Sequence, residues 1–104
     1  MKLKRYEILL PLLYNDGQTI EKEKFLLTHK ELVEKFGATT TDSTMIVGRW
    51  IYQNQLYEDK LIRIAIDVPE SEDSETFFRR YKEVLKERFK QIDIWISSYS
   101  IEII

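Results

Sequence analysis

The sequence predicts an α+β fold in which four antiparallel strands form one sheet and two helices cover one of its faces. Three observations support this prediction. Apolar residues recur with a period of two in four segments and with a helical period in two others. These segments follow one another in the order β-α-β-β-α-β, and the chain of 104 residues is long enough for one hydrophobic core. We therefore expect a single domain, residues 1–104.

The first strand is expected over residues 6–14, where Tyr6, Ile8 and Leu10 alternate with more polar neighbours. Asn-Asp-Gly at 15–17 ends it as a turn. Pro11 cannot donate a hydrogen bond to a sheet, so either the pairing ends near Leu10 or a bulge lies there.

The first helix is expected from about Glu21 to Phe36, with Phe25 and Leu32 on its apolar stripe. The segment Thr28 to Glu31 matches a capping box, which would start the helix later, but the stripe favours the longer helix. Gly37 follows where a left-handed residue commonly ends a helix.

Two alternating segments, Met45 to Tyr52 and Leu56 to Val68, predict a β-hairpin. The polar residues between them, 53–55, suggest a loop of about three residues. Pro69 ends the second arm of the hairpin.

The second helix is expected after the acidic run Glu70 to Glu75, which suits a helix N-terminus. Its apolar stripe is Phe77, Phe78, Tyr81, Val84, Leu85 and Phe89. The last strand is expected from about Ile92 to the C-terminus, with a bulge at Ser97-Ser98, where the apolar alternation changes phase.

This order of elements predicts the ferredoxin-like βαββαβ sandwich, with strand order 4-1-3-2 and both helices on one face. Alternation then assigns one set of strand residues to the helix-covered core. That set is Tyr6, Ile8, Leu10, Ile46, Gly48, Trp50, Tyr52, Ile62, Ile64, Ile66, Val68, Ile92, Ile94 and Ile96. We expect Gly48 to let a helix approach the sheet closely.

The opposite set of strand residues faces away from both helices. No segment remains to cover it, although it carries apolar side chains, and such a patch usually marks an interaction site. The candidate interface or ligand face consists of Glu7, Leu9, Val47, Arg49, Ile51, Leu61, Arg63, Trp95 and Tyr99. We expect a second copy of the chain to cover it, and we expect Glu7 to pair with Arg63.

Bulk composition excludes several classes of site. The net charge of −2, with both signs interspersed, makes nucleic acid an improbable partner, and the RNA-binding signature is missing from the third strand. The chain has no cysteine and one histidine, so we expect no metal and no cofactor. The N-terminal segment fails as a secretory signal and no apolar run could span a membrane, which predicts a cytoplasmic protein.

No residue pattern points to catalysis. His29 shares the apolar stripe of the first helix, and Glu31, two residues later, faces another direction. No nucleotide-binding, nucleophile-elbow or calcium-binding motif occurs. We therefore expect no catalytic residue, and the sequence favours a binding protein over an enzyme.

The segments LVEKFGATT, GRW and FFRRYKEVLKERFKQ resemble a family of small bacterial proteins that form a domain of unknown function. The resemblance implies the ferredoxin-like fold and transfers no catalytic residue. The sequence thus favours a non-enzymatic, homo-oligomeric binding or assembly module, a dimer through the open sheet face. The alternative is a small-molecule sensor or cofactor-free enzyme with a pocket at a dimer interface.

Overall fold

The computed structural model describes residues 1–104 and confirms the predicted fold class. Its elements are β1 (Lys2–Pro11), α1 (Lys22–Phe36), β2 (Thr40–Tyr52), β3 (Gln55–Val68), α2 (Glu72–Arg88) and β4 (Trp95–Glu102). All strand pairs are antiparallel and the sheet order is β2-β3-β1-β4, which is the predicted order 4-1-3-2 read from the other edge. This is the ferredoxin-like arrangement.

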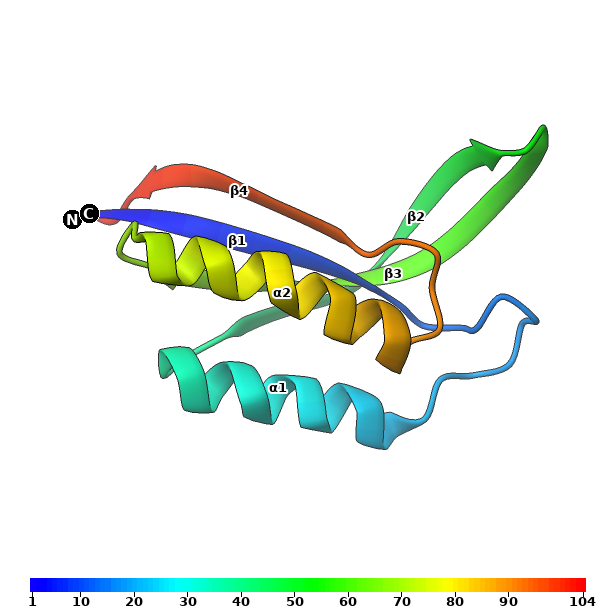
Figure 1. Ribbon diagram of the computed structural model, residues 1–104, viewed down its shortest axis with the longest axis horizontal. Helices are drawn as coiled ribbons and strands as arrows, with labels where there is room; N and C mark the ends of the chain where they lie inside the picture. Colours follow the sequence, from blue (N-terminus) through cyan, green and yellow to red (C-terminus); the bar gives the residue numbers. More distant parts are fainter.

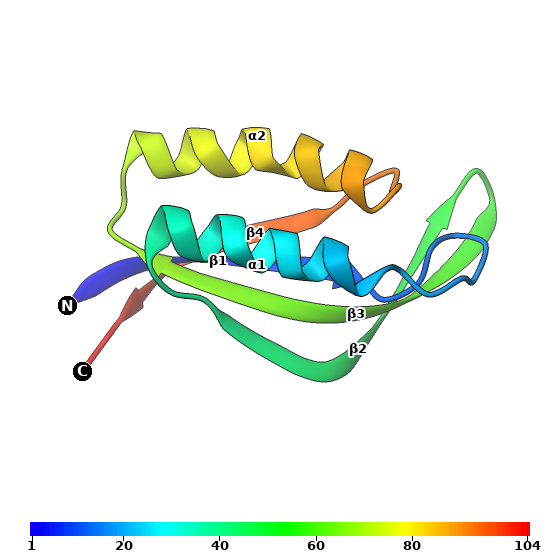
Figure 2. The ribbon, with the colours of Figure 1, turned by 90° about the horizontal axis from the view of Figure 1, so that it is seen from below.

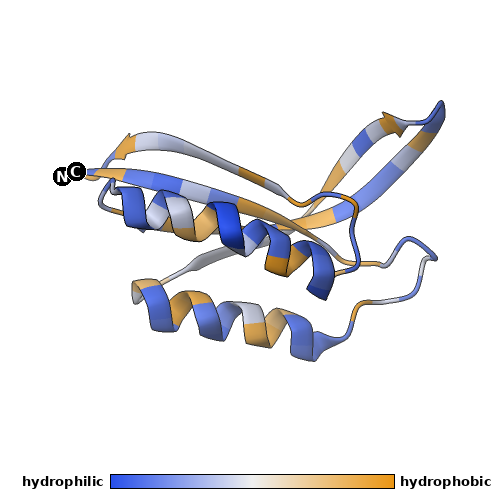
Figure 3. Ribbon diagram, in the orientation of Figure 1, coloured by the Kyte–Doolittle hydropathy of each residue, from blue (hydrophilic) through white to orange (hydrophobic).

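Both helices lie on the same side of the sheet and run in opposite directions (Figures 1 and 2). Hydrophobic and hydrophilic bands alternate along each helix, as expected for helices that have one face on a core (Figure 3). The other side of the sheet carries no helix. The fold therefore has two layers, and one sheet face is left open.

The core between the layers is built from β1, β3 and the two helices. Ile8, Leu10, Leu32, Ile64 and Ile66 have no solvent exposure. Aromatic rings fill the end of this core where α1 stops. Phe36 stacks on Phe78 with ring centroids 5.2 Å apart, and Phe78 stacks on Tyr6 at 4.0 Å. The core residues predicted on β1 and β3 are thus confirmed, with Ile62 partly buried at the edge.

The helix ends follow the capping signals in the sequence. α1 begins at Lys22, so the longer of the two expected helices is the observed one. Gly37 has a left-handed φ of 90° and its N–H donates to the Val33 carbonyl at 2.7 Å. At the start of α2, Ser71 accepts a hydrogen bond from the Ser74 N–H, so the acidic run is a helix N-terminus as expected.

A half-buried polar cluster links the two helices. Arg88 Nη1 lies 2.7 Å from Glu31 Oε1 and 2.8 Å from Thr28 Oγ1, and the Tyr81 hydroxyl donates to Glu31. Burial raises the pKa of Tyr81 to about 12. Burial also favours the neutral form of Glu31, but the hydrogen bonds from Arg88 and Tyr81 outweigh it and lower the pKa of Glu31. Thr28 therefore takes part in the contact between the two helices and does not cap α1.

β2 differs from its prediction at its start. The strand begins at Thr40 and not at Met45, because the threonine-rich segment pairs with β3, Thr40 opposite Ala65 and Asp42 opposite Arg63. The pairing is then irregular between Asp42 and Ile46 before it resumes with Ile46 opposite Leu61. This irregularity is a bulge in an edge strand.

The hairpin turn also differs from its prediction, and the difference changes which way β2 faces. Gln53 and Asn54 form a two-residue turn with φ of 50° and 64°, and Tyr52 pairs with Gln55. Positive φ at both central residues is the signature of a type I′ turn. A loop of three residues would have paired Tyr52 with Leu56, and a shift of one residue moves every side chain to the other face.

The predicted core assignment of β2 is therefore wrong. Residues that pair directly share a face, so Ile46, Gly48, Trp50 and Tyr52 lie on the side of Leu61, Asp59, Tyr57 and Gln55, away from the helices. The outer half of this hairpin bends away from the helices (Figure 1).

β4 is shorter than predicted and has no bulge. It begins at Trp95, and its pairing with β1 runs without interruption from Leu9 opposite Trp95 to Lys2 opposite Glu102. The residues just before β4 stay out of the sheet because Asp93 engages them in other contacts. Its carboxylate accepts a hydrogen bond from the Ile94 N–H at 2.9 Å and forms an ion pair with Lys82 at 2.9 Å. Ile94 is buried as predicted, whereas Ile92, before the strand, is 49% exposed.

Replacing Ile64 by alanine should lower the free energy of unfolding by about 2–5 kcal/mol, because a fully buried side chain leaves a cavity in the centre of the core. Urea denaturation measures the change. Ile51→Ala, at a position that is 73% exposed, is the matched control and should change stability by less than about 0.5 kcal/mol. Equal effects of the two substitutions would contradict this core.

Replacing Gln53 by asparagine together with Asn54 by glycine should raise the free energy of unfolding by about 1 kcal/mol, because Asn-Gly suits two residues with positive φ. Thermal and urea denaturation measure the gain. Gln55→Gly, one residue beyond the turn, should instead destabilise by about 0.5–1 kcal/mol, since glycine weakens a strand. A loss of stability in the Asn-Gly variant would argue against the two-residue turn.

Candidate functional site

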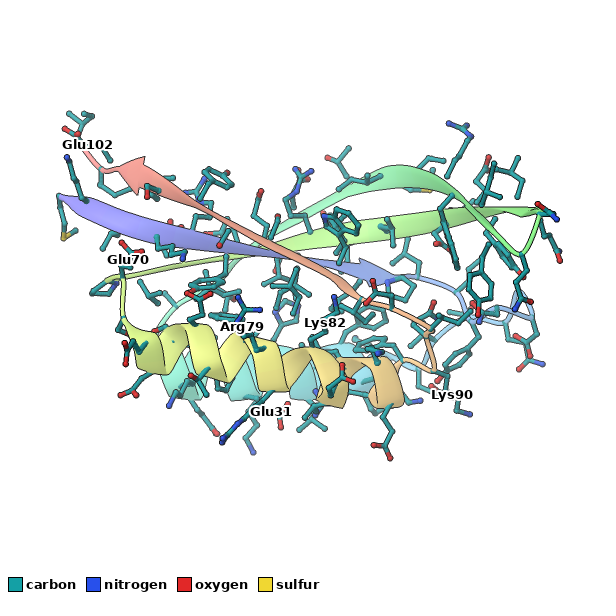
Figure 4. All side chains as sticks on the ribbon, turned by 45° about the horizontal axis from the view of Figure 1, so that its top comes forward. Glu31, Glu70, Arg79, Lys82, Lys90 and Glu102 are labelled. Atoms are coloured by element: carbon teal, nitrogen blue, oxygen red, sulfur yellow. The ribbon has the colours of Figure 1, made fainter.

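The candidate site is the open face of the sheet, the side that faces away from α1 and α2. Side chains stand out from this face and no other element lies over it (Figure 4). The strand register assigns to it Arg5, Glu7, Leu9, Pro11, Ile46, Gly48, Trp50, Tyr57, Asp59, Leu61, Arg63, Ala65, Asp67, Trp95, Ser97 and Tyr99.

Most of the predicted interface residues share this face. Glu7, Leu9, Leu61, Arg63, Trp95 and Tyr99 are all on it. Val47, Arg49 and Ile51 are not, because the two-residue turn places them on the other side of the hairpin. Their predicted place on the open face is corrected accordingly, and the role of the face as an interface stays a prediction.

The charged residues at the centre of the open face are paired with one another. Glu7 Oε2 lies 3.4 Å from Arg63 Nε, which confirms the predicted pair. Arg5 binds Asp67 with two hydrogen bonds, of 2.7 and 2.9 Å. These bonds hold the pKa of Asp67 below its ordinary value and the pKa of Arg5 above its own. The face therefore offers little net charge to a partner.

Large apolar side chains remain exposed around these pairs. Trp95 is 66% exposed and Tyr99 is 46% exposed. On the other side of the hairpin, Ile51 and Leu56 pair directly and are 73% and 64% exposed. Both sides of the projecting hairpin thus carry apolar side chains in solvent.

A hollow of about 310 Å³ lies on the open face between the hairpin and the segment that leads into β4. Leu9, Pro11 and Leu61 belong to the central strands at this hollow, and Trp95 lies on the β4 side. Of the predicted residues, Leu9, Arg49, Leu61 and Trp95 line it. Arg63 and Tyr99, which belong to the predicted interface or ligand face, lie outside the hollow.

The hairpin side of the hollow is an aromatic wall that was missed in the sequence. Trp50 stacks on Tyr57, which it opposes in the register, with ring centroids 4.7 Å apart. Trp50 Nε1 also donates to Asp59 Oδ2 at 2.6 Å. A two-residue turn at Gln53 and Asn54 would have been the sequence signal for this wall. It pairs Tyr52 with Gln55, and that register places Trp50, Tyr57 and Asp59 on the open face.

Gly48 has a different role from the one expected. A Cβ atom at this position would lie 3.2 Å from Leu61 Cδ1, and no helix atom is among its close neighbours. Gly48 also lines the hollow. The glycine therefore leaves space on the open face and does not serve helix packing.

Outside the open face, the residues of interest are the single histidine and the acidic side chains. His29 is half-buried on α1. No group of three or more His, Cys, Asp or Glu side chains is placed to hold a metal ion. Neither helix has the length and hydrophobicity that a membrane-spanning helix requires.

Solved structures share this fold, although no protein-family model and no curated protein matches the chain. A phage SAM lyase in complex with S-methyl-5'-thioadenosine has a TM-score of 0.67 and 19% identity, with 97% of this chain and 90% of that chain covered. The divalent cation tolerance protein CutA1 from Thermus thermophilus has a TM-score of 0.63 and 16% identity, with 99% and 86% covered.

The phage SAM lyase in its apo state gives a TM-score of 0.63 at 19% identity, with 98% of this chain and 90% of that chain covered. At these identities the similarity concerns the fold alone. The ferredoxin-like fold implied by the resemblance to small bacterial proteins is thus shared with solved proteins.

The Arg5–Asp67 pair predicts a loss of stability in acid. Because the pKa of Asp67 is lowered in the folded state, its contribution is present above the ordinary value of 3.8 and is lost as the pH falls through the folded pKa. Asp67→Asn should therefore reduce the dependence of stability on pH below about 4. The pKa values of Glu21, Glu31, Asp42 and Glu75 are lowered too, so part of the dependence should remain.

Urea denaturation between about pH 2.5 and 6 measures this effect, with Glu87→Gln at an exposed position of α2 as the control. The control should keep the dependence of the unsubstituted protein. An Asp67→Asn variant with an unchanged profile would contradict the contribution of the pair.

Proposed function

We propose that this protein is a non-enzymatic, homo-oligomeric binding module, a single cytoplasmic domain that works through the open face of its sheet. The observation that supports this proposal is an uncovered sheet face that combines exposed aromatic residues with charges already paired within the chain. Trp95 and Tyr99 supply the apolar surface, and the Arg5–Asp67 and Glu7–Arg63 pairs neutralise the charges between them. Exposed apolar patches of this kind are typical of protein interfaces.

A second copy of the chain suits this face better than a charged partner does. Nucleic acid would require basic side chains free to contact phosphates, and both arginines of the central face are held by carboxylates. A face whose central charges are paired within the chain can contact its own copy without strong like-charge repulsion. The projecting hairpin supports the same proposal, because a two-stranded hairpin with apolar side chains on both sides gains stability when another surface covers it.

The hollow favours a second candidate function, in which the protein binds a small molecule and acts as a sensor or a cofactor-free enzyme. It lies on the same face, so a second copy that covers the face would also close the hollow. The phage SAM lyase was solved with S-methyl-5'-thioadenosine, which supports the capacity of this fold to hold a small molecule. The fold does not specify the ligand, which depends on the residues that line the hollow.

Light scattering coupled to gel filtration tests the assembly. We expect a dimer or larger species at protein concentrations of about 10–100 μM, and we expect Trp95→Glu to weaken the association at least about tenfold, because a charge would be buried at the contact. Val84→Glu is the matched control, since Val84 is exposed on α2, away from the open face. It should leave the oligomer intact.

A protein that stays monomeric up to about 1 mM, a concentration at which even weak contacts form, would overturn the assembly. Equal weakening by Trp95→Glu and Val84→Glu would place the contact elsewhere than on the open face.

A further inference from the structure

The residues that line the hollow include a negative charge that has no positive partner, whereas the charges at the centre of the open face are paired. Arg49 is the only basic residue among those that line the hollow, and its Nε lies 3.0 Å from Glu58 Oε2. Asp93 is neutralised by Lys82 at 2.9 Å. Asp59 forms no ion pair, and its carboxylate has one hydrogen bond, from Trp50 Nε1 to Oδ2. The hollow therefore holds one negative charge without a counter-charge.

Aromatic residues line the same hollow. Trp50 and Tyr57 form a stacked wall on the hairpin, and Trp95 lies at the start of β4. The face of an aromatic ring attracts cations, and indole does so most strongly. Hydrogen bonding from Trp50 fixes the Asp59 carboxylate beside this wall.

Anionic ligands do not fit this chemistry. A phosphate or carboxylate group in the hollow would lie near Asp59 and would find no free cation among the lining residues, since Arg49 is paired. The volume of about 310 Å³ suits a compact organic molecule and lies at the lower end of ligand sites, roughly 300–1,000 Å³.

We propose that the hollow between the hairpin and β4 binds a small organic cation, a quaternary or otherwise alkylated cationic group on an apolar or planar body. The cationic centre lies against Asp59 and the indole rings, and Leu9, Pro11 and Leu61 contact the apolar part. This inference deepens the second candidate function, small-molecule binding, and it does not require that copies of the chain assemble.

The chain offers a direct spectroscopic test, because Trp50 and Trp95 are its only two tryptophans and both line the hollow. Choline is the cationic probe, and 3,3-dimethyl-1-butanol is its neutral counterpart of the same shape. Titration of the full chain is followed by the indole N–H resonances in NMR spectra, at an ionic strength held constant with sodium chloride. We expect choline to shift both indole resonances, and the neutral alcohol to bind at least about tenfold more weakly.

Asp59→Asn removes the charge but keeps an amide oxygen that can accept the Trp50 hydrogen bond, so the aromatic wall is preserved. It should weaken choline binding at least about tenfold. Glu87→Gln is the control, because Glu87 is an exposed acid on α2, does not line the hollow and forms no ion pair with a residue that does. It should leave the affinity within about twofold of the unsubstituted protein.

Equal binding of choline and the neutral alcohol would overturn the proposal, as would an Asp59→Asn variant with full affinity for choline. Indole resonances that stay unshifted at about 50 mM choline would overturn it as well, since cation binding in an aromatic site should be detectable at that concentration.

Light scattering on the same samples separates cation binding in the hollow from assembly through the open face. Choline binding by a monomer supports the hollow and contradicts the assembly, and an intact oligomer that ignores choline does the reverse.

Discussion

The turn at Gln53 and Asn54 is the constraint on which the open face depends. It closes the hairpin with two residues of positive φ, and this fixes Tyr52 opposite Gln55. Every pair farther down the hairpin inherits that register, so Trp50 meets Tyr57 and Gly48 meets Asp59 on the side away from the helices. The aromatic wall, the carboxylate beside it and the space left by the glycine are consequences of a single local geometry.

The overall fold could be predicted because several independent signals agreed. The buried isoleucines of β3 alternate without exception, and the two helices carry clear stripes and end signals such as Gly37. These patterns determine which faces of β1 and β3 meet the helices, and they also explain why the Glu7–Arg63 pair could be foreseen. Cross-strand neighbours follow directly once the register of two buried strands is known.

The orientation of β2 could not be predicted in the same way, because both of its faces are apolar. Ile46 and Trp50 alternate with Val47 and Ile51, so the pattern predicts a strand but gives no preference for either face. Only the length of the turn distinguishes the two registers, and Gln-Asn is a weaker turn signal than Asn-Gly. The hollow could not be predicted from the sequence for a related reason. It depends on the bend of the hairpin and on the irregular segment before β4, which alternation does not encode.

The bulge between Asp42 and Ile46 has a consequence for the way this chain meets other molecules. β2 is an edge strand, and a regular edge offers unpaired backbone groups on which the strand of another chain could grow. The irregular stretch interrupts that row of groups part-way along the strand. It therefore protects this edge of the sheet, which would otherwise be long and regular, against sheet-to-sheet extension and fibril growth.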